Sequence, residues 1–223
     1  MFRFKQFAVS NDRAAMRIGT DGVLLGAWCD VSGARRVLDV GTGTGVIALM
    51  IAQRSPEAKV DAIDIDRVAC GEAEDNFGAS AWSARLSVEC CSLAQYDADP
   101  YDLIVCNPPY YNGYRVEDES RRAARHADSL PLDVLVSTSC RLLTPSGTLA
   151  MVLPRDNDAE VRRLALLNGL HVARHTAVLP VVSRPPKRSL WQLGREQVVE
   201  IADELVLHSD RYKRLVHDFY LYE

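Results

Sequence analysis

Asp102-Leu103-Ile104-Val105-Cys106-Asn107-Pro108-Pro109-Tyr110 is the stretch around which the rest of the chain is arranged. Its apolar, β-branched residues 103–105 predict a short buried strand. Two prolines then end the strand, because neither can donate to a sheet ladder and each fixes its own φ near about −65°. The strand therefore leads into a stiff, extended loop that begins with Asn107 and reaches Tyr110.

This loop carries groups that can hold a planar amine. The side-chain oxygen of Asn107 and the carbonyl of Pro108 can together accept both hydrogens of an –NH2 group. The Tyr110 ring can stack on the flat system that carries the amine. The four-residue pattern after an apolar strand therefore favours a site for an aromatic amine or an amide nitrogen over a proline-rich turn without a ligand.

A second motif, upstream, is typical of a nucleotide site. Residues 36–40 predict a buried strand, Gly41-Thr42-Gly43-Thr44-Gly45 follows it, and 46–52 continue as an apolar helix. Doubly wound α/β folds place nucleotides at such a strand, glycine loop and helix. The sixth loop position is Val46 and not the glycine of a dinucleotide fingerprint. Asp39, just before the loop, suits a cationic amino-acid moiety better than a pyrophosphate, which an acid would repel.

Polar residues at the ends of the next two strands extend this site. Asp64 ends the strand predicted at 59–63 and lies nineteen residues after Gly45. That spacing is close to the roughly twenty residues expected for a carboxylate that binds ribose hydroxyls. Ser92 follows the strand predicted at 86–90, and we expect it to lie beside the adenine of a bound nucleoside.

Residues 1–30 form an extension before the first main strand. Residues 2–9 predict one extended run, 10–13 a turn and 15–18 the return strand. Thr20 or Asp21 is then expected to cap a helix that runs to Trp28. We expect this extension to lie over the cofactor site and residues 31–223 to form the main domain.

The remaining pattern continues the alternation of strands and helices. It predicts helices over 130–143 and 158–167, strands over 148–153 and 170–179, an antiparallel strand over 190–193, and a short strand over 205–207. Alternating strands and helices indicate an α/β fold with a mostly parallel sheet.

The charge of the chain is uneven. The net charge of −4 argues by itself against a nucleic-acid partner, but residues 161–195 contain seven basic residues and no acid. Such asymmetry suggests one positive face. Residues 110–129 interleave tyrosines with arginines, which suits stacking on bases and pairing with phosphates. The candidate nucleic-acid contacts in these two segments are Tyr110, Arg125, His126, Lys187 and Arg188.

Composition excludes several classes of protein. The sequence contains no run of eighteen apolar residues and therefore predicts no membrane span. Residues 1–5 lack the apolar core of a signal peptide. The six cysteines are scattered and form no C-x-x-C pair, so the sequence predicts no metal site. We expect reduced core cysteines in a cytoplasmic protein, and a monomer.

The motifs at residues 39–45, 64 and 107–110 together resemble class I S-adenosylmethionine-dependent methyltransferases that act on amino groups. Four further stretches make the chain similar to the bacterial tRNA(Val) adenine N6-methyltransferase family, which methylates the adenine next to the anticodon. They are Phe4-Lys5-Gln6-Phe7, residues 16–22 (Met-Arg-Ile-Gly-Thr-Asp-Gly), Ala124-Arg125-His126 and Asp218-Phe219-Tyr220-Leu221.

The resemblance implies a Rossmann-like fold with a seven-stranded, mostly parallel sheet and helices on both faces. It implies transfer of a methyl group from S-adenosylmethionine to the N6 amine of adenine 37 in tRNA(Val). The residues that it assigns to the cofactor are Asp39, Gly41, Thr42, Gly43, Gly45, Asp64, Ile65, Ser92 and Asn107. Those that it assigns to catalysis are Asn107, Pro108 and Tyr110. An acid commonly follows the third strand in this superfamily, whereas Cys91-Ser92 occupies that place here.

Two other functions remain open from the sequence. A protein methyltransferase acting on a glutamine amide, such as that of a release factor, would need the same Asn-Pro-Pro-Tyr, because an amide offers the same planar –NH2. A module that binds the cofactor or RNA without turnover is the third possibility, and the intact Asn107 and glycine loop count against it.

Overall fold

One mixed sheet organises the molecule, for which the computed structural model describes residues 1–14, 18–108 and 130–221. Within these residues the order of strands is β10-β8-β9-β7-β6-β3-β4-β5. β9 is antiparallel to both of its neighbours, and the other neighbouring strands are parallel. The strands are β3 (Arg36–Val40), β4 (Lys59–Asp64), β5 (Leu86–Cys90), β6 (Tyr101–Cys106), β7 (Leu143–Pro154), β8 (His171–Leu179), β9 (Arg188–Gly194) and β10 (Ile201–Val206).

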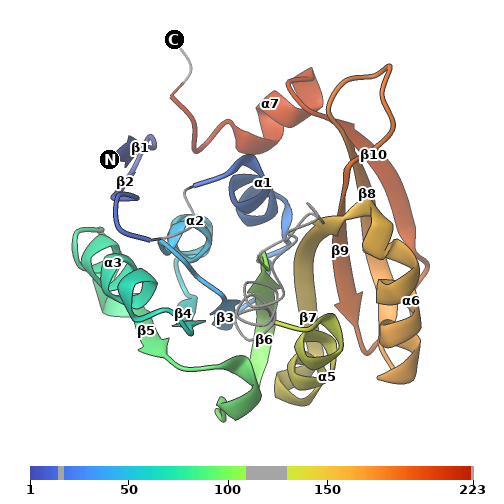
Figure 1. The fold of residues 1–223 in the computed structure, drawn as a ribbon, viewed down its shortest axis with the longest axis horizontal. Helices are drawn as coiled ribbons and strands as arrows, with labels where there is room; N and C mark the ends of the chain where they lie inside the picture. Colours follow the sequence, from blue (N-terminus) through green and yellow to red (C-terminus); the bar gives the residue numbers. More distant parts are fainter. Residues whose placement is uncertain (15–17, 109–129, 222–223) are drawn as a thin grey trace, which may run out of the picture.

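Helices cover both faces of the sheet (Figure 1). One face carries α1 (Thr20–Trp28), α2 (Val46–Arg54), α3 (Arg67–Gly78) and α7 (Asp210–Val216), and the other carries α5 (Leu132–Leu142) and α6 (Asp158–Leu167). Within the described residues, no helix is long and apolar enough to cross a membrane.

The central strands are apolar on both sides because both of their faces are covered. In β3, Val37 belongs to the core under α1 and α2, while Leu38 belongs to the core under α5 and α6. Val105 and Ile104 of β6 divide between the two cores in the same way. This alternation fixes the register of β3 against β6, since a slip of one residue would exchange the two faces.

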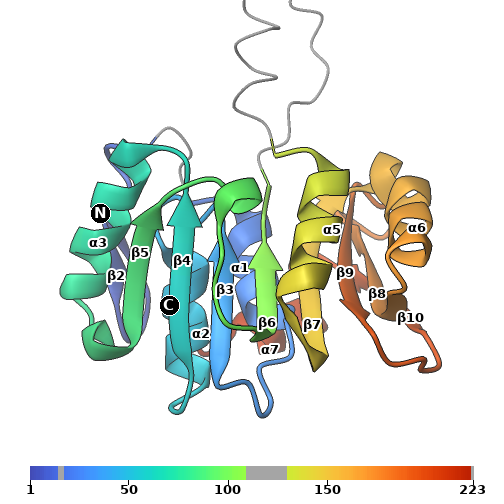
Figure 2. The same cartoon turned by 90° about the horizontal axis from the view of Figure 1, so that it is seen from below.

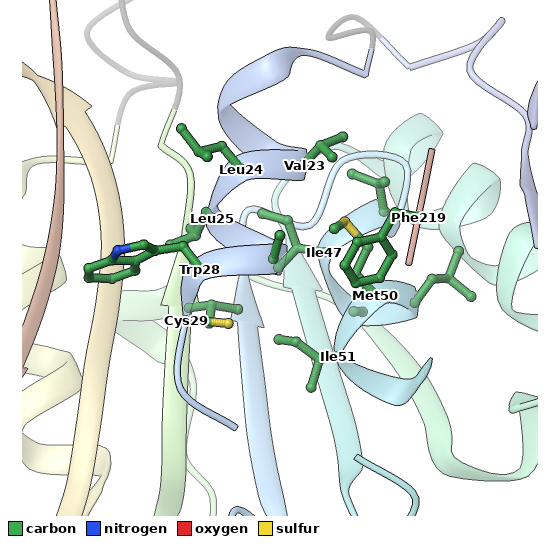
Figure 3. Close-up of a cluster of buried hydrophobic side chains, with 14 of the residues drawn as sticks. Val23, Leu24, Leu25, Trp28, Cys29, Ile47, Met50, Ile51 and Phe219 are labelled. Atoms are coloured by element: carbon green, nitrogen blue, oxygen red, sulfur yellow. The ribbon is translucent and has the colours of Figure 1, made fainter. Parts of the chain in front are cut away.

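α1 is an integral part of the core. Seven of its nine residues are buried, so the helix has no polar face turned to water, as expected for a helix packed on all sides. Its apolar side chains meet those of α2 and Phe219, near the end of the chain (Figure 3). Trp28 also donates from its indole Nε1 to Thr176 Oγ1 on β8, at 3.0 Å. α1 therefore links the start of the chain to the far half of the sheet.

The α/β fold with a mostly parallel sheet is confirmed, and its strand count differs from the seven that the resemblance implied. The eighth strand of the sheet is β10, which pairs in parallel with β8 at the sheet edge. The residue pattern indicated a strand only at 205–207, because the polar residues Asp203 and Glu204 interrupt its apolar run. Polar residues are tolerated in β10 because it is an edge strand in which Leu205 is buried and the other residues are accessible or partly accessible.

The amino-terminal segment contains a turn that the sequence did not predict. β1 (Phe2–Arg3) pairs antiparallel with β2 (Ala8–Val9), so the chain reverses within residues 4–7 and the single extended run predicted over 2–9 is wrong. The chain also bends at residues 12–14, which overlap the turn predicted at 10–13. The Phe4 N–H donates to the Phe7 carbonyl at 2.8 Å, and the two rings stack with centroids 4.5 Å apart. The sequence pattern placed Phe4 and Phe7 in one strand. In the structure their rings pack against each other and stabilise a turn. Of the predicted return strand, residues 15–17 lie outside the described residues.

Candidate active site at the carboxyl ends of the strands

The two sequence motifs leave neighbouring strands at the same edge of the sheet, the upper edge in Figure 2. β3 pairs in parallel with β6, with Val40 opposite Cys106, so the glycine loop and Asn107 begin side by side. The chain order also reverses between these two strands: from β3 it continues through β4 to β5, and β6 then returns to the other side of β3. Open α/β sheets bind ligands at such a switch point.

The glycine loop has the backbone of a close-approach site. Gly41, Gly43 and Gly45 all have positive φ, at 68°, 56° and 81°. A Cβ built on Gly43 would meet no atom of the described protein within 4 Å, whereas one on Gly45 would lie 2.4 Å from the ring of Phe77 in α3. The middle of the loop therefore leaves space for a ligand, and its last glycine lets α3 pack against the loop.

Asp39 carries a buried carboxyl group, and only one of its two oxygens accepts hydrogen bonds from the described residues. Its side chain is 0% exposed, and Oδ2 accepts from the Thr42 hydroxyl at 2.7 Å and from the Ala48 N–H at 3.2 Å. Oδ1 is buried and has no hydrogen-bond partner among the described residues. Burial raises the pKa of Asp39 to about 7, against the lowering effect of the two hydrogen bonds. A cationic group near Oδ1 would satisfy it.

Asp64 faces the loop from the end of β4. Its Oδ2 accepts from the Gly43 N–H at 2.9 Å, and its Oδ1 accepts from the Asp66 N–H at 3.0 Å. The carboxylate is thereby held at the mouth of the site and keeps lone pairs for hydroxyl donors. Ile65 is 51% exposed directly beside it, and Ser92, after β5, donates to the Gln95 side chain at 3.2 Å. An exposed apolar residue between these polar groups suits the edge of a base.

Asn107 follows β6 with an unused acceptor. Its Oδ1 is buried and without a partner among the described residues, and its Nδ2 lies 3.6 Å from the position that a Cβ of Gly22 in α1 would take. Pro108 is buried next to it. A buried acceptor without a partner is costly, so a bound amine would stabilise this arrangement. Tyr110, Arg125 and His126 lie outside the described residues.

The two basic residues predicted for RNA binding have different surroundings. Arg188, at the start of β9, donates from Nε to Asp21 in α1 at 2.8 Å, and Lys187 is exposed in the loop before it. That loop connects β8 to β9 at the same edge as Asn107, because β8 runs parallel to β6. Asp21 therefore does not cap α1, whose N-cap residue, Gly19, has no side chain to do so. No local pattern could reveal this pair, since 167 residues separate its members.

The basic run 161–195 does not form one uninterrupted positive face. Arg162 makes a two-point pair with Glu200, and Arg163 pairs with Glu160 on its own helix. Arg174 lies over the Trp28 ring, 4.5 Å from its centroid. Both acids lie just outside the run, Glu160 directly before it and Glu200 shortly after it, so the charge count over 161–195 omitted them. In the described ranges no cluster of His, Cys, Asp and Glu could hold a metal ion.

Comparison with known proteins points to one family. Residues 18–182 match the family model of the methyltransferase small domain. The chain is 44% identical to a tRNA1(Val) (adenine(37)-N6)-methyltransferase of Aeromonas salmonicida, over 99% of this chain and 97% of the relative. A protein of the same name from Parabacteroides distasonis is 43% identical over 99% of this chain and 97% of its own length.

Solved structures agree on the fold. A protein of Agrobacterium tumefaciens described as an O-methyltransferase has a TM-score of 0.67 at 17% identity, covering 89% of this chain and 96% of that one. The ribosomal protein L11 methylase of Lactobacillus delbrueckii has a TM-score of 0.56 at 18% identity, covering 79% of this chain and 77% of that one. At these identities the likeness extends to the architecture of methyltransferases and not to the substrate.

Proposed function

Because the chain belongs to the methyltransferase small-domain family and, within it, to the tRNA1(Val) (adenine(37)-N6)-methyltransferases, we propose that it methylates the N6 amine of adenine 37 in tRNA(Val), with S-adenosylmethionine as the methyl donor. The observation that supports this chemistry best is the Oδ1 of Asn107, which is buried beside the glycine loop and has no hydrogen-bond partner among the described residues. It is the acceptor that a planar amine needs, next to the loop that can hold the donor.

The residues around the loop fit the cofactor. Asp39 Oδ1 suits its cationic amino group. Gly41 and Gly43, at which a Cβ would meet no atom of the described protein within 4 Å, leave the backbone open to its methionine moiety, and Thr42 and Gly45 complete the loop. Asp64 would accept from the ribose hydroxyls, with Ile65 and Ser92 along the adenine. When bound, S-adenosylmethionine supplies a sulfonium methyl group whose departure leaves a neutral sulfide, so no strong acid is required.

Asn107 and Pro108 would act on the target base. By accepting the amine hydrogens, the Asn107 oxygen and the Pro108 carbonyl aim the nitrogen and free its lone pair from conjugation with the ring. Once methylated, the nitrogen carries a positive charge and releases one proton to water, so no His or Lys is needed as a general base. The adenine would be flipped out of its stack onto Tyr110, with Arg125, His126, Lys187 and Arg188 along the RNA. The ion pair with Asp21 would keep Arg188, and with it the end of the loop, in a fixed position.

Three further assignments belong to this proposal. We place the protein in the cytoplasm, where tRNA is modified. We take it to be a monomer, and we assign residues 1–30 to an extension over the cofactor site. α1 within this extension supports that role, because Gly22 lies against Asn107.

Cofactor affinity is expected to increase with pH up to about 7. In the free protein the raised pKa of Asp39, about 7 through burial, leaves the carboxyl protonated at lower pH. A cationic amino group favours the carboxylate, so binding should release a proton and the affinity should rise by up to about tenfold per pH unit below pH 7. Calorimetry between pH 5.5 and 7.5, in two buffers of different ionisation enthalpy, measures both effects; this range stays below the α-amino pKa of roughly 8.

Asp39→Asn is the control for this pH dependence, and it should bind the cofactor more weakly with a flat profile. An equal slope in Asp39→Asn would assign the proton to another group. The same pKa has a second consequence: the folded protein binds the proton more tightly than the unfolded chain, so the contribution of Asp39 to stability is present at pH 4 and is lost as pH rises through about 7.

Transfer of labelled methyl from S-adenosylmethionine to separate pools of unmodified tRNA, rRNA, DNA and protein tests the function. We expect label in tRNA alone, recovered after digestion as N6-methyladenosine. A transcript of tRNA(Val) in which adenine 37 is replaced by guanine is the matched control and should accept no label. Label in protein alone would instead make the chain a glutamine-amide methyltransferase. Cofactor binding without transfer to any pool would identify a binding module.

A further inference from the structure

Glu72 on α3 is a buried carboxylate that binds the backbone of a distant segment, residues 10–14. The side chain is 0% exposed. Its Oε1 accepts from the N–H groups of Asp12 and Arg13 at 2.9 and 3.1 Å, and its Oε2 accepts from the N–H of Ala14 at 2.8 Å. Three successive backbone N–H groups form an anion-binding concavity. The anion that they bind here is the side-chain carboxylate of Glu72.

The charge of Glu72 is stabilised by these donors. Burial by itself raises the pKa of this carboxyl, but the N–H groups of Ala14, Arg13 and Asp12 outweigh burial and hold the pKa below its ordinary value. The guanidinium of Arg13 adds a cationic partner, since its Nε lies 3.9 Å from Oε1. Glu72 is therefore ionised at neutral pH, and hydrogen bonds to a charged acceptor are the strong ones. Segment 10–14 is fixed to α3 at three points.

Asn76, one helical turn later, connects that segment to the glycine loop. Its Oδ1 accepts from the Ser10 N–H at 2.8 Å, and its Nδ2 donates both to the Ser10 carbonyl at 3.0 Å and to the Thr44 carbonyl at 2.9 Å. Thr44 lies between Gly43 and Gly45. Residues four apart lie on the same face of a helix, so Glu72 and Asn76 form one continuous attachment surface.

The glycine loop is thus held from two sides. From the ligand side, Asp64 accepts from the Gly43 N–H at 2.9 Å, and from the helix side, Asn76 donates to the next residue. Hydrogen bonds that fix both sides of a loop reduce the entropy it loses when a ligand binds. Because Asn76 also bonds Ser10, the position of segment 10–14 and that of the loop are joined through one amide.

We propose that Glu72 and Asn76 are positioning residues for S-adenosylmethionine, which join segment 10–14 to the glycine loop so that docking of this segment and cofactor binding strengthen each other. The inference rests on the proposed function, because it takes the loop as the cofactor site. Neither side chain needs to touch the cofactor. Thermodynamic linkage requires that the coupling be reciprocal: if the segment favours the cofactor, the cofactor must stabilise the segment by the same factor.

Substitutions on α3 test the three hydrogen bonds of Asn76. Asn76→Asp keeps the acceptor for the Ser10 N–H but replaces the Nδ2 donor to the Ser10 and Thr44 carbonyls by a carboxylate oxygen, and Asn76→Ala removes every contact. For both we expect the Kd and the KM of S-adenosylmethionine to rise by about tenfold, with kcat at saturating cofactor and the KM of tRNA within about twofold of wild type. Glu72→Gln should raise the cofactor Kd about threefold.

Glu74→Gln is the matched control for Glu72→Gln. It removes the same charge from the same helix, but Glu74 is exposed. It should bind the cofactor as wild type does. Melting temperatures identify variants that fail to fold. If the Asn76 variants do not fold, the cofactor affinity of Glu72→Gln is compared with that of wild type instead. A lowered melting temperature with unchanged cofactor affinity in Asn76→Asp and Glu72→Gln would reduce both residues to structural supports and overturn the proposal.

Hydrogen exchange tests the reciprocal effect without RNA. S-adenosylmethionine should slow exchange of the amides of residues 12–14 in the wild-type protein by about the factor by which Asn76→Asp weakens binding, and should not slow it in Asn76→Asp. Unchanged exchange at residues 12–14 on cofactor binding to wild type would refute the coupling. Because this readout needs only the cofactor, a protein that binds it normally and methylates no tRNA would contradict the proposed function and leave the coupling standing.

Discussion

Asn107→Ala is expected to lower kcat by about 10²–10³-fold and to leave the cofactor Kd within about threefold of wild type. The magnitude is that of removing one group that stabilises the developing charge in a preorganised site, about 2.7–4 kcal/mol. The reason for the split is geometric. The Oδ1 of Asn107 has no hydrogen-bond partner among the described residues, so its removal breaks no contact with the glycine loop. Single-turnover methylation of tRNA and calorimetry with S-adenosylmethionine measure the two quantities.

Asn168→Ala is the matched control for Asn107→Ala. Asn168 donates from Nδ2 to the Leu164 carbonyl at the end of α6, at 2.8 Å, and plays no part in the proposed site. It should cost about 1 kcal/mol of stability and leave kcat unchanged. Equal losses of cofactor affinity and kcat in Asn107→Ala would mean that this residue belongs to the cofactor site alone and that the amine acceptor lies elsewhere.

The sequence predicted those parts of the candidate site whose signal is local. Strand β6, its proline stop and the glycine loop each occupy a few consecutive residues, and the parallel register then brings Val40 and Cys106 together. Asp39 was singled out from its place before the loop, because an acid there suits a cationic group better than a pyrophosphate. The positive φ values of Gly41, Gly43 and Gly45 explain why the loop contains glycine at these positions, since other residues adopt such values only with strain.

Contacts between distant residues could not be predicted in this way. The Asp21–Arg188 pair joins α1 to β9, and Glu72 looked like any charged residue of a helix, although it is 0% exposed. Burial of a carboxylate requires donors, and here the donors are backbone N–H groups, which every segment of sequence has. The extended run predicted over residues 2–9 was wrong for a related reason, because the chain turns where Phe4 stacks on Phe7.

Gly45→Ala and Gly43→Ala are expected to fail in opposite ways, although both place a Cβ on a glycine with positive φ. At Gly45 the new Cβ would lie 2.4 Å from the ring of Phe77, which is 3% exposed and cannot move away freely. Overpacking of this kind costs about 1–3 kcal/mol, and the left-handed backbone adds about 1 kcal/mol. Gly45→Ala should therefore lose about 2–4 kcal/mol in the free energy of unfolding, measured by urea denaturation without cofactor.

At Gly43 a Cβ meets no atom of the described protein within 4 Å, so Gly43→Ala should lose only the backbone term of about 1 kcal/mol. Its defect should appear in binding, because the open space is where we place the cofactor, and the S-adenosylmethionine Kd should rise at least tenfold. Phe77→Leu combined with Gly45→Ala supplies the decisive comparison: a smaller side chain opposite the new Cβ should recover part of the lost stability, whereas Phe77→Leu cannot rescue Gly43→Ala. If Gly43→Ala bound the cofactor normally, the space above the loop would not be the cofactor site, and the roles given to Asp39 and Asp64 would have to be reassigned with it.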